Sequence, residues 1–311
     1  TLSIASDSDA KNAGAYAITG KAENKNYKVT FTGNWQGEEG DQNNNKAGTY
    51  TIDPRPINVQ IGNAEGFYGD APVLTGVTLT YESTVDNRGL APDEENVPGI
   101  ELGTGANKES PVAEYTIYAV NGDNRVELIK PVVIGNYNVT FTQNGTYTVK
   151  QRPITITIAD QESDYGCEIA MLAYSETLSE AYTGTNENVV FVGDDETNLG
   201  ITLSTTANKS SDAGAYSISG KVTNTDLAKN YAITWKGQTP YQENEEQATY
   251  TVEKATLAVE FTNEEVTVSM GGTVNNPLKF INQSNSDEEL GGQPQDVTVK
   301  YSSNDQGVAT V

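Results

Sequence analysis

Residues 136–149 form the most informative stretch of the sequence, Asn-Tyr-Asn-Val-Thr-Phe-Thr-Gln-Asn-Gly-Thr-Tyr-Thr-Val. Apolar and polar side chains alternate, so that Tyr137, Val139 and Phe141 would point to one face of an extended strand. This period of two is typical of a half-buried β-strand. Asn144-Gly145 lies between two such runs, and Asn-Gly favours a type I′ turn because both of its positions adopt positive φ. The stretch therefore predicts a β-hairpin.

The same pattern occurs three times along the chain, with closing-strand tyrosines roughly 100 residues apart, which predicts one domain per repeat. The three kinds of block are Ala13–Ile18, Ala113–Ile117 and Ala213–Ile218; Asn26–Phe31, Asn136–Phe141 and Asn230–Trp235; and Gly48–Ile52, Gly145–Val149 and Ala248–Val252. We expect Tyr16, Tyr115 and Tyr216 to be core or half-buried residues of equivalent strands. Trp235 occupies the position of Phe141 and is predicted to pack in a core.

The blocks predict four segments: residues 1–54, the C-terminal part of a first repeat; 55–152 and 153–255, two full repeats; and 256–311, a different domain. We expect an all-β chain of tandem β-sandwich-like modules, either immunoglobulin-like or β-grasp-like. Short joints that contain proline restrict the backbone between modules, so an elongated, semi-rigid rod is predicted. Residues 169–181 are the one weak helical candidate.

The composition argues against several function classes. The chain has 43 acidic and 19 basic residues and a formal charge of −24, which would repel nucleic acid and anionic lipid. No apolar run is long enough to span a bilayer, so membrane insertion of this segment is not expected. Histidine is absent and Cys167 is the single cysteine, which rules out an internal disulfide and His-dependent nucleophile activation. We expect no cofactor and no metal.

With these blocks in view, residues 1–254 resemble tandem MBG domains of the YGX type, which occur in bacterial surface proteins. Tyr68-Gly69-Asp70 and Tyr165-Gly166-Cys167 would be the YGX signature, the second departing from the usual Asp. Residues 257–311 resemble a truncated bacterial immunoglobulin-like domain of group 2, through Val266–Thr273, Val297–Asn304 and Val308–Val311. The resemblance implies a surface location and no catalytic residues, and it implies that Tyr68, Gly69, Asp70, Tyr165 and Gly166 are structural.

Acidic clusters are the remaining candidates for chemistry. They are Glu38-Glu39, Asp93–Glu95, Asp194–Glu196, Glu243 with Glu245-Glu246, and Asp287–Glu289. We interpret them as solvated loop charges, with calcium ligation and carboxylate catalysis as the alternatives. The best local calcium candidates are Asp7 and Asp9 with Asn12, and Asp194-Asp195 with Asn198.

The sequence favours a non-enzymatic stalk or adhesion segment of a bacterial cell-surface protein, extracellular and monomeric. Its partners would be glycans or proteins of host or bacterial surfaces, and not nucleic acid. The alternative is a carbohydrate- or glycoprotein-binding module that uses loop aromatics. Trp35, between strands in Gly33–Gly37, is the candidate ligand-binding residue because it has no counterpart in the second copy.

Overall fold

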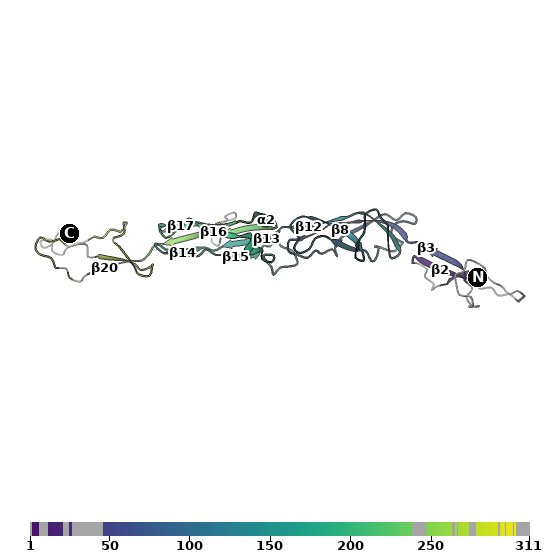
Figure 1. Cartoon of the computed structure of the whole chain (residues 1–311), viewed down its shortest axis with the longest axis horizontal. Coiled ribbons are helices and arrows are strands. Elements are labelled where there is room, and N and C mark those ends of the chain that lie inside the picture. The colour runs from purple at the N-terminus through teal and green to yellow at the C-terminus, as the bar shows by residue number, and fades with distance from the viewer. Residues whose placement is uncertain are drawn as a thin grey trace. The chain divides into compact units, whose positions relative to one another are not determined.

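A computed structural model of the chain describes residues 2–5, 12–20, 25–26, 46–237, 247–262, 265, 267–273, 278–291, 293–295, 297–300 and 302. The chain divides into two compact units. Unit 1 is Thr1–Arg152 with Gly184–Asn186, and unit 2 is Pro153–Thr183 with Glu187–Val311. Strands carry nearly all of the regular structure that is described, beside two short helices (Figure 1). The predicted all-β, sandwich-like class is confirmed. The four-segment division and the rod stay predictions.

The described residues of unit 1 form three sheets. The first has the antiparallel order β1-β2-β3, the second the order β10-β11-β4-β6, and the third the order β5-β12-β8-β7 with β9 on β8. Two pairs are parallel, β11 with β4 and β12 with β5. The strands are β1 (Leu2–Ala5), β2 (Gly14–Gly20), β3 (Lys46–Ile52), β4 (Arg55–Ile61), β5 (Ala64–Phe67), β6 (Leu79–Tyr81), β7 (Glu101–Thr104), β8 (Glu114–Asn121), β9 (Asn124–Arg125), β10 (Val132–Ile134), β11 (Tyr137–Gln143) and β12 (Gly145–Lys150).

The core of unit 1 follows from the alternation in β4, β8, β11 and β12. Tyr137, Val139 and Phe141 of β11 are each at most 1% exposed, and the residues between them are half-buried. The predicted buried face of this strand is thus confirmed. Ile57 and Val59 of β4 are buried beside it in the parallel pair. Each such side chain contributes about 1.5–3 kcal/mol of transfer free energy when fully buried.

The predicted hairpin at Asn144-Gly145 is wrong. β11 pairs with β10 and β4, whereas β12 pairs with β5 and β8 in the other sheet, so Asn144 connects two sheets. Neither Asn144 nor Gly145 has the positive φ of a type I′ turn. Glycine is needed here for close packing, because a Cβ at Gly145 would lie 1.9 Å from the carbonyl oxygen of Gly62.

Unit 2 has a related arrangement. Its sheets have the orders β15-β13-β18, β14-β19-β17-β16 and β20-β21-β22, and β14 pairs with β19 in parallel. The strands are β13 (Arg152–Ile158), β14 (Gln161–Asp164), β15 (Tyr174–Leu178), β16 (Ile201–Thr205), β17 (Gly214–Val222), β18 (Tyr231–Gly237), β19 (Gln247–Glu253), β20 (Leu257–Phe261), β21 (Leu278–Asn282) and β22 (Glu288–Leu290). The helices are α1 (Asp195–Leu199) and α2 (Thr225–Ala228).

The weak helical candidate at residues 169–181 is wrong as well. Ile169, Ala170 and Leu172 lie in irregular backbone and pack against the core, and β15 follows them. That core contains Ile158, Ile218 and Tyr250 among its buried residues, and Trp235 packs against it. The predicted packing of Trp235 is confirmed. The local apolar content suggested a helix, but these side chains are partly buried against the core from irregular backbone.

The three aligned tyrosines have equivalent strand registers. Tyr16 lies opposite Tyr50, Tyr115 opposite Tyr147, and Tyr216 opposite Tyr250, each across an antiparallel pair. The first tyrosine of each pair is half-buried. Each also donates its hydroxyl hydrogen bond to the backbone carbonyl four residues earlier, at Asn12, Pro111 and Asp212, over 2.7, 2.9 and 2.8 Å. The prediction that Tyr16, Tyr115 and Tyr216 occupy equivalent strands is confirmed.

Candidate functional site

The two Tyr-Gly-X motifs form equivalent tight turns after parallel edge strands. In the first, Asp70 N donates to the Phe67 carbonyl over 3.0 Å, and Gly69 has φ +88°. In the second, Cys167 N donates to the Asp164 carbonyl over 3.1 Å, and Gly166 has φ +83°. A positive φ at the third position is typical of a type II turn, where glycine avoids the strain of a Cβ. The motif's glycine therefore has a conformational cause.

The tyrosine of each motif continues the preceding parallel ladder. Tyr68 N donates to the Lys150 carbonyl over 2.9 Å, and Tyr165 N donates to the Glu253 carbonyl over 2.8 Å. Their side chains differ, because Tyr68 is 7% exposed and Tyr165 is 46% exposed. The main chain of the motif is thus the shared feature, and it places the X residue at the same point beyond the end of the sheet.

Asp70, the first X residue, is held in a buried ion pair with Arg152. Arg152 is 0% exposed and Asp70 is 7% exposed. Nη1 of Arg152 is 3.4 Å from Oδ1 of Asp70 and donates to the Tyr68 carbonyl over 3.1 Å. Nη2 donates to the Asn186 carbonyl over 2.8 Å, and Thr185 N donates to Oδ2 of Asp70 over 3.3 Å. The segment Gly184–Asn186 thereby belongs to unit 1 through both partners of the ion pair.

Cys167 occupies the same position in the second turn and bonds differently. Its Sγ lies 3.1 Å from the Ser284 carbonyl oxygen, to which the thiol can donate. Asn282 is 6% exposed and donates from Nδ2 to the Tyr165 carbonyl over 3.2 Å. A Cβ at Gly166 would lie 2.9 Å from that Nδ2 atom. Both turns thus present the X side chain and the tyrosine carbonyl to a polar partner far along the sequence.

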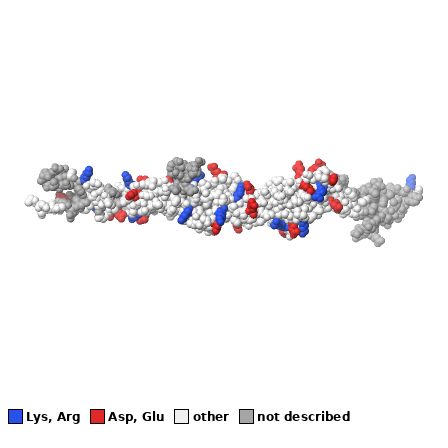
Figure 2. All heavy atoms as spheres, turned by 90° about the horizontal axis from the view of Figure 1, so that it is seen from above, with Lys and Arg blue, Asp and Glu red and all other residues white. Residues whose placement is uncertain are grey.

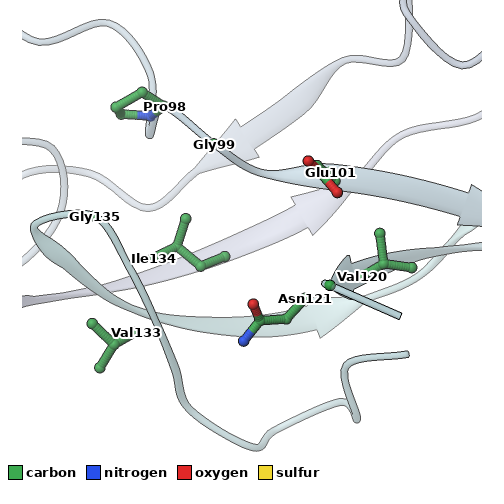
Figure 3. A pocket seen from close by; sticks show the side chains of 9 residues that line it. Pro98, Gly99, Glu101, Val120, Asn121, Val133, Ile134 and Gly135 are labelled. Atoms are coloured by element: carbon green, nitrogen blue, oxygen red, sulfur yellow. The ribbon is translucent and has the colours of Figure 1, made fainter. Parts of the chain in front are cut away.

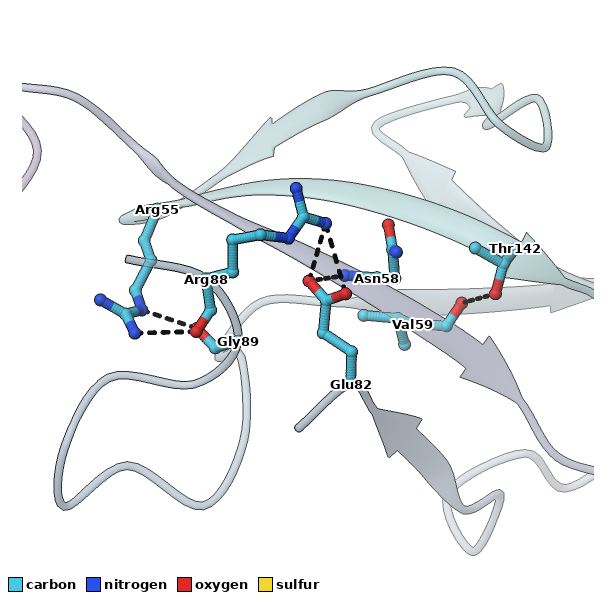
Figure 4. Close-up of polar contacts among 7 residues, drawn as sticks. All are labelled: Arg55, Asn58, Val59, Glu82, Arg88, Gly89 and Thr142. Carbon is cyan, nitrogen blue, oxygen red and sulfur yellow. Dashed lines mark hydrogen bonds and ion pairs between the residues drawn. The ribbon is translucent and has the colours of Figure 1, made fainter. Parts of the chain in front are cut away.

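Arg55 is the counterpart of Arg152 in the Arg-Pro-Ile motif. Its Nε donates to the Gly89 carbonyl over 2.8 Å, and its Nη2 donates to the carbonyls of Asp86 and Arg88 over 3.0 and 2.8 Å. Figure 4 shows this side chain reaching the loop that follows β6. From the sequence, these two arginines were identified only as residues of the short proline-containing linkers between repeats. Sequence reasoning missed their binding role, although their fixed spacing from the closing tyrosines was a usable signal.

The loop beside Arg55 is held by a second set of polar contacts. Arg88 Nη2 lies 3.0 Å from Oε1 of Glu82, and the same oxygen accepts from Asn58 N over 2.9 Å (Figure 4). Thr142 Oγ1 is 3.4 Å from the Val59 carbonyl oxygen. Arg88 is half exposed, so its ion pair contributes at most about 1 kcal/mol. The contacts of Glu82 with Asn58 and Arg88 connect β4 with the loop that Arg55 binds, whereas the Thr142 contact lies between β11 and β4.

Two acidic clusters anchor buried tyrosines. Tyr137 Oη accepts from Ala91 N over 2.8 Å and donates to the Glu94 carboxylate. Burial, and then the hydrogen bond to Glu94, raise the pKa of Tyr137 above its usual value.

Unit 2 repeats this anchor. Tyr231 Oη accepts from Val192 N over 2.9 Å and donates to Oδ2 of Asp195 over 2.7 Å. Glu94 of cluster 93–95 and Asp195 of cluster 194–196 are thus structural hydrogen-bond acceptors, which refines the interpretation of these clusters as solvated loop charges. Among the described residues, no group of three or more acidic or cysteine side chains is placed to hold a metal ion.

A pocket of about 540 Å³ lies in unit 1 between the ends of β7, β8 and β10. Figure 3 shows its lining residues, among them Pro98, Glu101, Asn121, Val133 and Gly135. Among the described residues that line this pocket, Glu101 carries the carboxylate. The face in Figure 2 carries acidic and basic side chains interspersed along it.

Several sequence candidates lie outside the described residues. They are Trp35, Asp7 and Asp9, Glu38-Glu39, and Glu243 with Glu245-Glu246. Glycan binding through Trp35 therefore stays a prediction. In the described part of the chain, no helix has the length and apolarity needed to span a bilayer.

No protein-family model matches the chain, and no curated protein matches its sequence. The resemblance to tandem MBG and bacterial immunoglobulin-like domains therefore stays a prediction, based on the motifs quoted above.

Proposed function

We propose that this chain is a non-enzymatic repeat segment of a bacterial cell-surface protein, extracellular, and acting as a stalk or adhesion module. The observation that carries the proposal is the repeated Tyr-Gly-X turn. In both copies, the X residue contacts a residue of the next segment, as the four segments were predicted from the sequence. In unit 1, Asp70 binds Thr185; in unit 2, Cys167 contacts Ser284. A stalk needs such bonded joints, because hinges without them would let successive modules fold back.

A third contact of this kind supports the proposal. Asn136 accepts at Oδ1 from Ala13 N over 3.0 Å and donates from Nδ2 to Oδ1 of Asn12 over 2.9 Å. Asn136 is the first residue of the Asn-Tyr block, and Asn12 belongs to the first predicted segment. Side-chain amides and backbone groups suit such joints because their hydrogen bonds are directional and do not depend on pH.

Small-angle scattering on the monomer tests the proposal. A compact body of this length has a radius of gyration of about 20 Å, whereas modules in line would give roughly 30 Å. The stalk proposal expects the larger value, and a value near the smaller one contradicts it. Surface location is tested separately, by labelling intact cells with an antibody raised against this segment.

A further inference from the structure

The second repeat has an edge strand where the third repeat has a helix. In the second repeat, the connection between β8 and β11 contains β9 and β10, and β10 extends the sheet beside β11. In the third repeat, the corresponding connection between β17 and β18 contains the short helix α2. Every residue from 46 to 237 is described, and within that stretch β10 pairs with β11 alone. The outer edge of β10 is therefore unpaired in this part of the chain.

The outer edge of β10 presents the backbone donor and the backbone acceptor of one residue. Arg55 N donates to the Asn136 carbonyl over 2.8 Å, so the even-numbered residues at the start of β11 form their backbone bonds toward β4. The odd-numbered residues of β11 consequently bond toward β10, where their partners are Val132 and Ile134. Val133 lies between these two residues, so its N–H and C=O point away from β11.

Exposed apolar side chains accompany this edge. Leu128, Ile129 and Val133 are 41%, 68% and 59% exposed. Ile129 N donates to the Phe141 carbonyl over 2.9 Å, which places the segment before β10 on the same side of β11. Ile129 has φ +63°, an unfavourable conformation for a β-branched residue. Backbone strain of this kind is common in segments that bind a partner, because the surrounding structure must hold it in place.

The charge of this segment favours a second copy of the chain as its partner. The chain carries a formal charge of −24, so two copies in general repel each other. Residues 122–135 are locally neutral, because they contain two acidic and two basic residues: Asp123, Glu127, Arg125 and Lys130. Glu127 and Lys130 form an exposed ion pair over 3.4 Å. Repulsion between two copies is therefore weakest where these two segments meet, whereas a strongly charged partner gains little there.

We propose that two copies of this chain associate through β10, in antiparallel pairing about a two-fold axis at Val133. Each Val133 N–H donates to the Val133 carbonyl of the other copy, since one residue supplies both groups on the outer edge. The two valine side chains then lie directly opposite each other and contact. Because β10 has only 3 residues, the contact is weak, and the monomer expected from the sequence is the dilute state. This association does not rest on the stalk proposal.

Sedimentation of the full chain over a concentration series tests the association. We expect a reversible monomer–dimer equilibrium that strengthens as salt screens the repulsion between the two acidic molecules. Val133→Pro removes the N–H on the outer edge, a position where a strand tolerates proline, and should raise the dissociation constant about tenfold or more. Val133→Thr keeps that N–H and should change the dissociation constant much less. Absence of a dimer up to about 1 mM chain would overturn the proposal, and so would a dimer that Val133→Pro leaves unchanged.

Disulfide cross-linking locates the two-fold axis and does not depend on how well the Val133→Pro protein folds. Opposite residues of such a pair have Cα atoms about 5.5 Å apart, within the range that a disulfide spans. In a Cys167→Ser background, Val133→Cys should therefore cross-link two copies under mild oxidation. Val85→Cys is the matched control, because Val85 is a valine of unit 1 with 60% exposure, against 59% for Val133.

We expect the Val133→Cys protein to cross-link about tenfold faster than the Val85→Cys protein, because pairing holds the two thiols together. Equal rates for the two proteins would overturn the axis at Val133. The scattering test of the stalk proposal uses dilute monomer, so its result is independent of all these outcomes.

Discussion

The buried guanidinium of Arg152 binds the carboxylate of Asp70 across 82 residues of sequence, and the same group bonds the carbonyl of Tyr68. Both side chains are removed from water, so each compensates the desolvation of the other. We therefore expect Asp70→Ala to reduce the free energy of unfolding of unit 1 by about 3–5 kcal/mol, because it leaves a buried positive charge. Urea unfolding of the full chain, followed by a probe in unit 1, measures this loss.

The matched control for Asp70→Ala is Glu65→Ala, which removes the ion pair of Glu65 with Lys150. That pair is largely exposed and should contribute less than about 1 kcal/mol. If both variants lose the same free energy of unfolding, the buried pair has no special role in unit 1.

The turn glycines have a conformational role that alanine cannot fill. Gly69 and Gly166 have φ of +88° and +83°, so Gly69→Ala and Gly166→Ala should each lower the free energy of unfolding by about 1 kcal/mol or more. Gly76 has an ordinary φ, and a Cβ there would meet nothing within 4 Å. Gly76→Ala should therefore be neutral or slightly stabilising. Equal effects of all three in chemical denaturation would show that the turn conformation is not strained.

Gly145 distinguishes a sheet-to-sheet crossing from a hairpin. Asn is well tolerated in a type I′ turn, but here any Cβ would meet the Gly62 carbonyl oxygen at 1.9 Å. We expect Gly145→Asn and Gly145→Ala to destabilise unit 1 alike, by on the order of 1–3 kcal/mol, the usual cost of overpacking. Thermal unfolding of the two variants checks this. A neutral Gly145→Asn would favour the hairpin that the local sequence suggests.

Tyr137 should make the stability of unit 1 depend on pH in the alkaline range. Burial and the hydrogen bond to Glu94 raise its pKa above 10.0, the usual value, which we take for the unfolded chain. A raised folded pKa gives a stabilising contribution that is complete below the unfolded pKa and is lost as the pH rises through the folded pKa. The difference in free energy of unfolding between the natural protein and Tyr137→Phe should therefore shrink above pH 10.0.

Urea unfolding of both proteins over this pH range measures that difference. Lysine titration cancels, because both proteins contain the same lysines. A difference in free energy of unfolding that stays constant with pH would contradict a raised pKa of Tyr137.

The local alternation of apolar and polar residues predicted which side chains of a strand face the core and which face away from it. The alternation in residues 137–141 was enough to identify the buried face of β11, because successive strand side chains point to opposite sides. The repeat of Tyr16, Tyr115 and Tyr216 was enough to identify equivalent strands, since similar alternating patterns roughly 100 residues apart favour similar antiparallel pairings. The Tyr-Gly-X motif was visible as a motif, and its glycine has a local cause.

The tertiary structure alone decided which strands pair and what the motif binds. Asn144-Gly145 has the local signature of a hairpin, yet β11 pairs with β4 from more than 80 residues earlier, and β12 crosses to the other sheet. Nothing near Asp70 in sequence indicates Arg152 as its partner. These are long-range relationships, set by which sheets can bury their apolar faces against one another. A local window predicts the conformation of a strand, but the partner of a strand or of a buried charge depends on the whole packed unit.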